Sequence, residues 1–495
     1  PLRGCFFYLV MDACKRKTKQ GLGLHLVELL KLCAKKKDLK QAMALHDHIS
    51  RTGDGLRLLR EDPYIASALI SMYAKCDALV QAKTVFDQLQ SRTAVCWNSL
   101  ITGYAHQGHG QEALNCFEQM QRDGFSADVV TFLSVLKACG SIGALERGKE
   151  VHAKIIEQGI LGEETLIANA IVDMYAKCGA VAKAQEVFDE LDVWTIVSWN
   201  ALIAGYANHG YGEEALFFFE QMQLKGISPD AITYISSLKG SGSIASINRS
   251  QKLHIEVIER GLENHSSIGN TLVDTYAKCG SMIEACEVFD KLLAQSVVSW
   301  TALIAGYVQH GDGEEALTCF KKMPKDDPVP NPFTFVYILK ACGSIGALDK
   351  GREIHVEIVR RRFLDMSLST ALVEMYARCA SLVKAQQVFD ELPIRDVVSW
   401  TILLAGFAHT GNDVIVIHHL ENMLRDGIEP DEVTFTLLFN VCSHSGQLDK
   451  AQLYFETMIT YYNIIPNLEH YTCMVDLFSR ARLFDKAIVL ITSMP

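Results

Sequence analysis

The stretch VSWNALIAGYANHGYGEEALFFFEQM, which runs from Val197 to Met222, decides the fold because the chain contains three further near-copies of it. Each copy contains one tryptophan, and successive tryptophans lie 102, 101 and 100 residues apart. These residues are Trp97, Trp199, Trp300 and Trp400. The next residue is asparagine in the first two copies and threonine in the last two. A frame therefore repeats closely while one polar position inside it varies.

Each copy of the frame predicts a pair of α-helices. Apolar residues recur at helical spacing ahead of the segment NHGYG, at Trp199, Leu202, Ile203 and Tyr206. That segment interrupts the pattern, and a second apolar series then continues to Met222. A helix pair of this size cannot bury its own apolar face, so neighbouring pairs must stack into one continuous core. We therefore expect an all-α solenoid in which the four tryptophans are core residues.

Composition limits the function. The formal net charge is −11 and the sequence pI is near 5.8, which argues against binding nucleic acid through bulk electrostatics. Residues 1–60 are an exception, with 13 Lys and Arg against 5 Asp and Glu. Any contacts with phosphate groups must therefore be local.

The chain has fifteen cysteines, and eight of them follow the repeat rather than one another. Four follow YAK or YAR and four end LKLC, LKAC or FNVC, and no CxxC pair exists. The usual zinc and dithiol spacings are therefore missing. We expect small buried thiols at helix-packing positions, in a reducing compartment. No apolar run reaches the length of a membrane span.

Within each period of about 101 residues, three motifs recur in fixed order, with lengths near 35, 35 and 31 residues. They read SWNALIAGYANHGYGEEALFFFEQM, TFLSVLKACGSIGALERGKEVH and MYAKCGAVAKAQEVFDEL. This triplet resembles the pentatricopeptide repeat family of land plants, and within it the subclass whose P, L and S motifs alternate. The resemblance covers about 470 of the 495 residues. It implies a right-handed α-solenoid of helix-turn-helix repeats that binds single-stranded RNA in mitochondria or chloroplasts.

We label the units P, L and S after the motifs they resemble. Residues 1–22 remain an unassigned N-terminal remnant. About 14 units follow, namely L 23–62, S 63–93, P 94–128, L 129–164, S 165–195, P 196–230, L 231–265, S 266–296, P 297–331, L 332–365, S 366–396, P 397–431, L 432–467 and a partial S 468–495.

The resemblance implies that the fifth and last residues of a unit together select one base. Carried over by register, the fifth residues are Ser67, Asn98, Asn169, Asn200, Asn270, Thr301, Thr370, Thr401 and, in the last L unit, Thr436. Their partners are Thr93, Asp128, Thr195, Asp230, Ser296, Asn331, Asp396, Asp431 and Asn467. Side chains of these types can tell bases apart by donating or accepting hydrogen bonds. A plainer alternative is that the fifth residues cap the first helix of each unit.

The family's pairing rules, applied from the N-terminus as the 5′ end, imply the RNA R-U-n-Y-U-n-C-A-n-G-G-A. The letter n marks L units whose fifth residue is aliphatic and cannot hydrogen-bond a base; these are Leu133, Ile235 and Val336. We expect those units to act as spacers.

Two further registers carry candidate contacts. The second residues of the P units, Val95, Val197, Val298 and Val398, would wedge a base in the family, although core packing is equally compatible with valine. One S-unit position carries a basic residue, at Lys75, Lys177, Lys278 and Arg378. These residues could meet phosphates, with solvated surface lysine as the alternative.

Relatives with this triplet of motifs often end in a cytidine deaminase domain, whose zinc site needs H-x-E followed by P-C-x-x-C. H-x-E occurs at His254 and His355, but no P-C-x-x-C follows. We therefore expect no catalytic residues, metal or cofactor in this chain, and a missing C-terminal region of the type called E/DYW in the family.

The favoured function is the specificity array of an organellar C-to-U RNA editing factor, whose deaminase or editing cofactor proteins act in cis or in trans. An organellar RNA processing, splicing or stabilising factor without deaminase is the second hypothesis. A tetratricopeptide-like protein–protein scaffold is the third, and the acidic charge favours it.

Overall fold

The structure, a computed structural model, describes residues 19–51, 62–89, 91–160, 165–324, 327–408, 413–492 and 494. Over these residues the chain forms 28 α-helices and no β-strand. None of the described helices is both long enough and apolar enough to cross a membrane. The proposed remnant 1–22 lies largely outside the described residues, because the first described helix begins at Lys19.

The helices come in pairs joined by short turns. In the P units they are α7 (Ala94–His106) and α8 (Gly110–Arg122), α13 (Ile196–Asn208) and α14 (Gly212–Leu224), α19 (Val297–Gln309) and α20 (Gly313–Lys322), and α25 (Val397–Ala408) and α26 (Asp413–Arg425). In the S units they are α5 (Pro63–Lys75) and α6 (Leu79–Asp87), α11 (Thr165–Lys177) and α12 (Val181–Asp189), α17 (Ser266–Lys278) and α18 (Met282–Lys291), α23 (Met366–Arg378) and α24 (Leu382–Asp390), and α29 (Leu468–Arg480) and α30 (Phe484–Thr492).

In the L units the pairs are α2 (Lys19–Lys36) and α3 (Leu39–Arg51), α9 (Val129–Ile142) and α10 (Leu145–Glu157), α15 (Ala231–Ser243) and α16 (Ile247–Glu259), α21 (Pro332–Ile345) and α22 (Leu348–Arg361), and α27 (Glu432–Ser445) and α28 (Leu448–Thr460). The turns inside several L pairs use a glycine in the left-handed conformation, as at Gly143 and Gly346.

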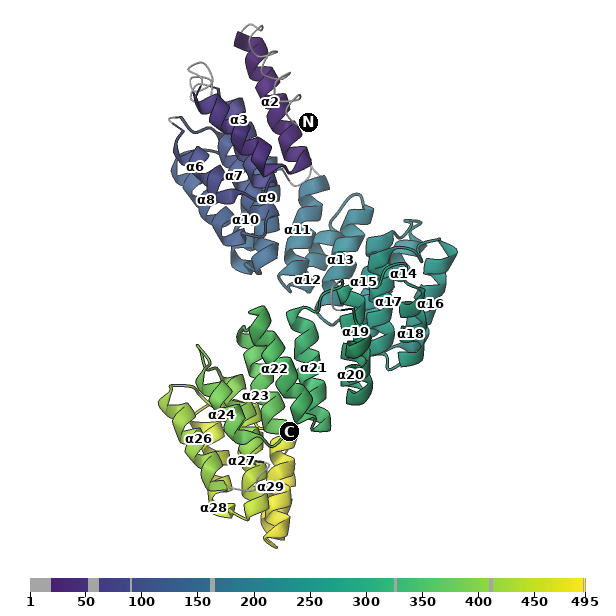
Figure 1. Cartoon of the computed structure of the whole chain (residues 1–495), viewed down its shortest axis with the longest axis vertical. Coiled ribbons are helices and arrows are strands. Elements are labelled where there is room, and N and C mark those ends of the chain that lie inside the picture. The colour runs from purple at the N-terminus through teal and green to yellow at the C-terminus, as the bar shows by residue number, and fades with distance from the viewer. Residues whose placement is uncertain are drawn as a thin grey trace. The chain divides into compact units, whose positions relative to one another are not determined.

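Helix pairs stack in series within each of two compact halves, Pro1–Leu253 and His254–Pro495. In the N-terminal half each first helix packs on the next, in the order α5, α7, α9, α11, α13 and α15. The C-terminal half repeats this arrangement from α17 to α29 by way of α19, α21, α23, α25 and α27, as Figure 1 shows. Within each half, first helices therefore line one face and second helices the other. The predicted all-α solenoid of helix-turn-helix repeats is confirmed.

The repeated tryptophans lie in the core, as the sequence predicts. All four are at most 6% exposed, and each contacts the phenylalanine near the end of the preceding S unit in an edge-to-face arrangement. The ring centroids of Trp199 and Phe188, for example, lie 4.8 Å apart. This contact joins an S unit to the following P unit by burying two large apolar side chains.

A glycine lets the first helices of S and P units approach closely. A Cβ atom at Gly205 would lie 2.6 Å from the Cβ of Ala176, well inside van der Waals contact. The same approach recurs at Gly103, Gly306 and Gly406. Glycine disfavours a helix, so its presence here is explained by the space the neighbouring helix occupies.

A histidine and a tyrosine join each of four L units to the next S unit, and the histidines are buried or half-buried. His152 Nδ1 and the Tyr175 hydroxyl lie 3.0 Å apart, and the same bond links His46 to Tyr73. In the C-terminal half it links His254 to Tyr276 and His355 to Tyr376. Burial lowers the pKa of the four histidines. Burial therefore favours the neutral form of these imidazoles.

The described cysteines are all free thiols, and most are buried. Cys178 donates a weak hydrogen bond to the carbonyl of Cys139, and Cys379 does the same to Cys342. Burial raises the pKa of Cys139 to about 12 and that of Cys342 to about 11. They behave as packing residues where the first helices of L and S units meet, as predicted.

Candidate functional site

The fifth residues lie inside the first helices, one turn beyond the start. Asn98, for instance, is the fifth residue of α7, and only 8% of it is exposed. Ser67, Asn169, Asn200 and Thr401 are also buried, while Asn270, Thr301, Thr370 and Thr436 are half-buried. The alternative that fifth residues cap their helix is therefore wrong, because a cap must precede the first helical residue.

The last residues are the ones that cap. Asp128, at the end of a P unit, accepts a hydrogen bond from the Thr131 N–H at 2.8 Å and so caps α9. The side chains of the other last residues likewise accept a hydrogen bond from a backbone N–H in the first turn of the next unit. These residues are Thr93, Thr195, Asp230, Ser296, Asn331, Asp396, Asp431 and Asn467. Capping alone favours Ser, Thr, Asp and Asn at this position. The small polar character of the last residues is therefore no separate sign of function.

Four of the predicted pairs are joined by direct hydrogen bonds. The Asn98 amide donates to the two carboxylate oxygens of Asp128 at 2.9 and 2.8 Å. Asn200 donates to Asp230 at 3.0 Å, and Asn169 donates to the Thr195 hydroxyl at 3.1 Å. At the fourth pair the direction is reversed, because the Ser296 hydroxyl donates to the oxygen of Asn270 at 3.3 Å.

The other five pairs show no direct bond among the described contacts. Three fifth residues bond instead to a carbonyl of their own helix: Ser67 to Tyr64, Thr370 to Met366 and Thr436 to Glu432. The remaining two pairs are bridged by a buried threonine. Thr334 lies between Thr301 and Asn331, and Thr434 lies between Thr401 and Asp431.

The surroundings of the Asp230 carboxyl favour its ionised form. Burial opposes its charge, but hydrogen bonds from the Thr233 N–H, the Asn200 amide and the Thr233 hydroxyl outweigh burial and lower its pKa. An ionised carboxylate can only accept hydrogen bonds. The pair of Asn200 and Asp230 therefore sets an N–H donor beside an obligate acceptor.

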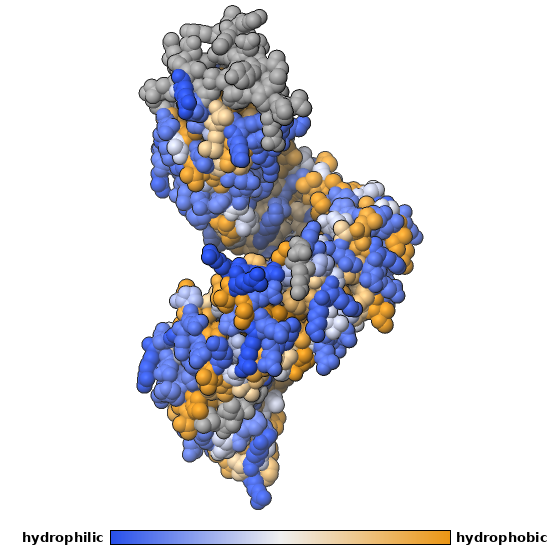
Figure 2. All heavy atoms as spheres, in the orientation of Figure 1, coloured by the Kyte–Doolittle hydropathy of each residue, from blue (hydrophilic) through white to orange (hydrophobic). Residues whose placement is uncertain are grey.

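The second residues form an exposed apolar series on the first helices. Val95, Val197, Val298 and Val398 are 46–56% exposed, which rules out core packing as their role. Sequence reasoning missed that other units continue the series, with Tyr64, Val130, Leu166, Ile232, Phe333 and Val433, all at least 51% exposed. The signal was available, because each residue stands three positions ahead of a fifth residue. Figure 2 shows how apolar and hydrophilic residues alternate over the visible face.

The basic S-unit residues are exposed and stand at the ends of the first helices. Three form ion pairs with an acid one turn earlier: Lys177 with Asp173 at 2.6 Å, Lys278 with Asp274 at 2.7 Å, and Arg378 with Glu374 at 2.9 Å. Surface pairs of this kind contribute little to stability and exchange readily. The lysines thus remain usable for phosphate, although their charge is partly neutralised.

A basic residue of the L units was missed by the sequence reasoning. The Lys137 ammonium lies 2.7 Å from His106 Nδ1, so a lysine of an L unit meets a histidine of the preceding P unit. Burial and the ammonium groups of Lys137 and Lys75 lower the pKa of His106. Burial is the larger cause that lowers the pKa of Lys137, and the nearby Lys177 ammonium lowers it further. Lys75, His106, Lys137 and Lys177 therefore form a local basic cluster in a chain of net negative charge.

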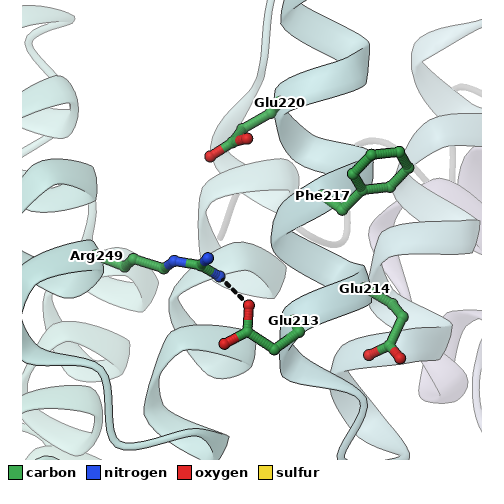
Figure 3. Close-up of a pocket in the computed structure, with 5 residues that line it drawn as sticks. All are labelled: Glu213, Glu214, Phe217, Glu220 and Arg249. Atoms are coloured by element: carbon green, nitrogen blue, oxygen red, sulfur yellow. Dashed lines mark hydrogen bonds and ion pairs between the residues drawn. The ribbon is translucent and has the colours of Figure 1, made fainter.

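The H-x-E histidines have structural partners, since His254 and His355 bond to tyrosines as described above. Within the described ranges no group of three or more His, Cys, Asp or Glu could hold a metal. A shallow cavity of about 320 Å³ on α14 and α16 is lined by three glutamates, Phe217 and Arg249, with Arg249 ion-paired to Glu213 (Figure 3). It lies on second helices, and its acidic lining would repel phosphate.

The PPR repeat family profile matches residues 92–141, 195–241, 295–344 and 395–444. The PPR repeat profile matches residues 167–194, 270–297, 433–461 and 469–495. Together these segments cover more than half of the chain. The chain belongs to the pentatricopeptide repeat family.

Relatives within the pentatricopeptide repeat family match over almost the whole chain. A putative pentatricopeptide repeat-containing protein of Arabidopsis thaliana is 34% identical over 478 residues, which are 95% of this chain and 68% of the relative. A mitochondrial relative from the same plant is 32% identical over 469 residues, covering 94% of this chain and 67% of the relative. Other relatives are longer, and this chain spans 44% to 55% of some of them.

The fold also matches a solved pentatricopeptide repeat protein. The crystal structure of PPR10 from maize superposes with a TM-score of 0.53 at 16% identity, covering 99% of this chain and 88% of PPR10. This likeness concerns the fold alone.

Proposed function

We propose that this pentatricopeptide repeat chain binds single-stranded RNA along its first-helix face, with one nucleotide facing each repeat and the base read by the P units, the S units and the last L unit. The observation that carries the proposal is the recurrence of a hydrogen-bonded polar pair at one register, as in Asn98 with Asp128 and Asn200 with Asp230. A donor set beside an acceptor complements uracil, which offers an oxygen acceptor and an N–H donor on its Watson–Crick edge. The exposed second residues support stacking with bases, and the basic cluster around Lys137 supports contact with phosphates.

The finer proposal is that the chain belongs to the subclass with alternating P, L and S motifs and is the specificity array of an organellar C-to-U editing factor. The fixed order of three unit lengths supports it. A deaminase or editing cofactor proteins would act in cis or in trans. Several relatives carry mitochondrial or chloroplastic in their names, which supports an organellar location.

The test is binding of the purified chain to the RNA R-U-n-Y-U-n-C-A-n-G-G-A and to a scrambled RNA of equal composition. The salt concentration is held constant, because the phosphate contribution varies steeply with it. We expect a clear preference for the first RNA. Equal affinity for both would falsify base reading, and equal weak binding would favour the protein–protein scaffold, which the net charge of −11 also favours.

Editing needs a separate experiment. The chain is fused to a zinc cytidine deaminase domain and given an RNA with cytidines placed downstream of the bound segment. Conversion confined to one cytidine a few nucleotides beyond the last repeat supports the editing array. Tight, sequence-specific binding without conversion favours the processing, splicing or stabilising factor instead.

A further inference from the structure

A buried threonine stands at the third residue of four L units. Thr131, Thr233, Thr334 and Thr434 are each 0% exposed and lie in the first turn of α9, α15, α21 and α27. Each hydroxyl lies 2.6–2.9 Å from the fifth residue of the preceding P unit. A residue of one unit thus contacts the proposed base-reading group of another.

At Thr301 a buried hydroxyl links the fifth residue to the last residue of the unit. The Thr301 hydroxyl donates to the carbonyl of Val297 at 2.7 Å, since a carbonyl only accepts. The Thr334 hydroxyl lies 2.8 Å from Thr301 and 2.9 Å from the Asn331 side-chain oxygen, so its single proton is shared between two possible acceptors. At Thr401, which donates to Val397 at 2.8 Å, the Thr434 hydroxyl likewise lies 2.9 Å from the fifth residue and 2.7 Å from the Asp431 carboxylate. One buried threonine thus bridges the fifth and last residues of each of these units.

The same bridge occurs in the asparagine P units. The Thr131 hydroxyl lies 2.6 Å from the amide oxygen of Asn98 and 2.7 Å from the Asp128 carboxylate, and the amide nitrogen faces that carboxylate. Turning the amide would bring its oxygen against the carboxylate, so the direction of the amide is fixed. Thr233 makes the same contact with Asn200, at 2.6 Å.

The third residues that follow S units do not make this contact. Ser198 donates to the backbone carbonyl of Thr195 at 2.7 Å, and Ser299 donates to that of Ser296 at 2.9 Å. The amide oxygen of Asn169 is buried without a hydrogen-bond partner in the described structure. The Asn169 and Asn270 amides also bond in opposite directions, as described above. Their partners are hydroxyls, which can donate or accept, so nothing fixes the amide direction.

We infer that the L-unit threonines are positioning residues that hold the fifth and last residues of the P units in one arrangement, so that nucleotides at P units are discriminated more sharply than those at S units. This inference rests on the proposed function, since it concerns how the same site chooses a base. An acceptor at Thr301 beside the free amide of Asn331 complements the N–H donor and nitrogen acceptor of adenine. Two acceptors at Thr401 and Asp431 complement the two N–H donors of guanine.

The test compares variants of Thr334 with a matched control at Ser299. Affinities are measured for RNAs that differ only at the nucleotide facing Thr301, and for RNAs that differ only at the nucleotide facing Asn270. For Thr334→Val we expect the preference for adenine to fall about 2- to 10-fold, the effect of one net hydrogen bond. Thr334→Ser keeps the hydroxyl and should keep the preference. Ser299→Ala should leave the preference at Asn270 unchanged.

Discrimination at the other P units serves as an internal control in each variant. Partial unfolding would weaken every nucleotide contact together, whereas the inference requires a loss confined to one nucleotide. The same comparison with Thr131→Val at the nucleotide facing Asn98 provides a second, independent position. An unchanged preference in both valine variants, or an equal loss in Ser299→Ala, would overturn the inference. Failure of the proposed function is distinct, because the unmodified chain would then prefer no RNA.

Discussion

The amide of Asn98 in α7 donates to both carboxylate oxygens of Asp128, the residue that caps α9. One carboxylate therefore has two tasks, since it ends one unit as the proposed base-reading partner and begins the next as a helix cap. Substitutions at this position change helix stability and RNA preference together, and experiments must separate the two effects.

The double substitution Thr301→Asn with Asn331→Asp keeps a good cap and rebuilds the Asn98–Asp128 arrangement in the C-terminal half. Because Thr334 stands where Thr131 stands, the new amide meets the same neighbours. We expect the preference at that nucleotide to move from adenine to uracil, with about 1–3 kcal/mol of discrimination by analogy with bidentate base contacts. Competition binding with the two RNAs measures it. A preference that stays with adenine would contradict the assignment of Thr301.

Removing one hydroxyl from a buried histidine–tyrosine pair should destabilise the fold. Tyr175→Phe leaves the buried His152 imidazole without the bond of 3.0 Å that now satisfies it. We expect the free energy of unfolding to fall by about 1–3 kcal/mol. Urea denaturation of the purified chain checks this, with Tyr211→Phe as control because Tyr211 is 48% exposed. An equal effect in both variants would show that the pair contributes nothing special.

Stability should decline as the pH falls below about 6.5, the ordinary histidine value. Burial lowers the pKa of His46, His152, His254 and His355, so the unfolded chain takes up protons before the folded chain does. The stabilisation is complete above the unfolded pKa and is lost as the pH falls through the folded one. Nearby charges modify it, since Lys183 lowers and Glu190 raises the pKa of His152.

Urea midpoints measured between pH 5 and 8 test the pH dependence. Replacing His152 and His355 by glutamine removes two of the four tyrosine-bonded histidines, and the slope below pH 6.5 should become shallower. The Asp230 carboxyl does not interfere, because its pKa is lowered and it titrates only in more acidic solution. A slope unaltered by the two substitutions would assign the decline to other groups.

Adding a methyl group between the first helices of S and P units should also destabilise the fold. Gly205→Ala places a Cβ 2.6 Å from the Cβ of Ala176 and forces the helices apart. Overpacking of this kind destabilises by about 1–3 kcal/mol, although alanine itself favours a helix. The added substitution Ala176→Gly removes the clash and should restore stability in part. Thermal unfolding of the single and double variants measures the effect. An unchanged midpoint in Gly205→Ala would show that the two helices can move apart at little cost, and would contradict the prediction.

The fold could be predicted from sequence because its signals are local and repeated. Apolar spacing, the interrupting NHGYG segment and the tryptophans specify helix pairs, and the inability of one pair to bury its face requires stacking. The ion pair of Lys177 with Asp173 was equally readable, since residues four apart on a helix are neighbours.

Other features depend on contacts that no local pattern contains. Thr131 meets Asn98 across 33 positions, and neither residue is unusual for a helix start or interior. The exposed second residues were ambiguous for a different reason, since valine suits a core as well as a surface. The capping role of Asp128 was missed because the unit boundary was drawn immediately after it, which separated the cap from its helix.

Each kind of junction between units has its own contact. A glycine packs against an alanine where a P unit follows an S unit, and a threonine bonds to the fifth residue where an L unit follows a P unit. A histidine bonds to a tyrosine where an S unit follows an L unit. A single unit moved to another place in the array would meet neighbours that lack the residue its own contact needs. A block of three consecutive units carries one of each kind and presents matching ends. Recombination or engineering that lengthens the array should therefore succeed in whole triplets, so that recognition grows in steps of three repeats.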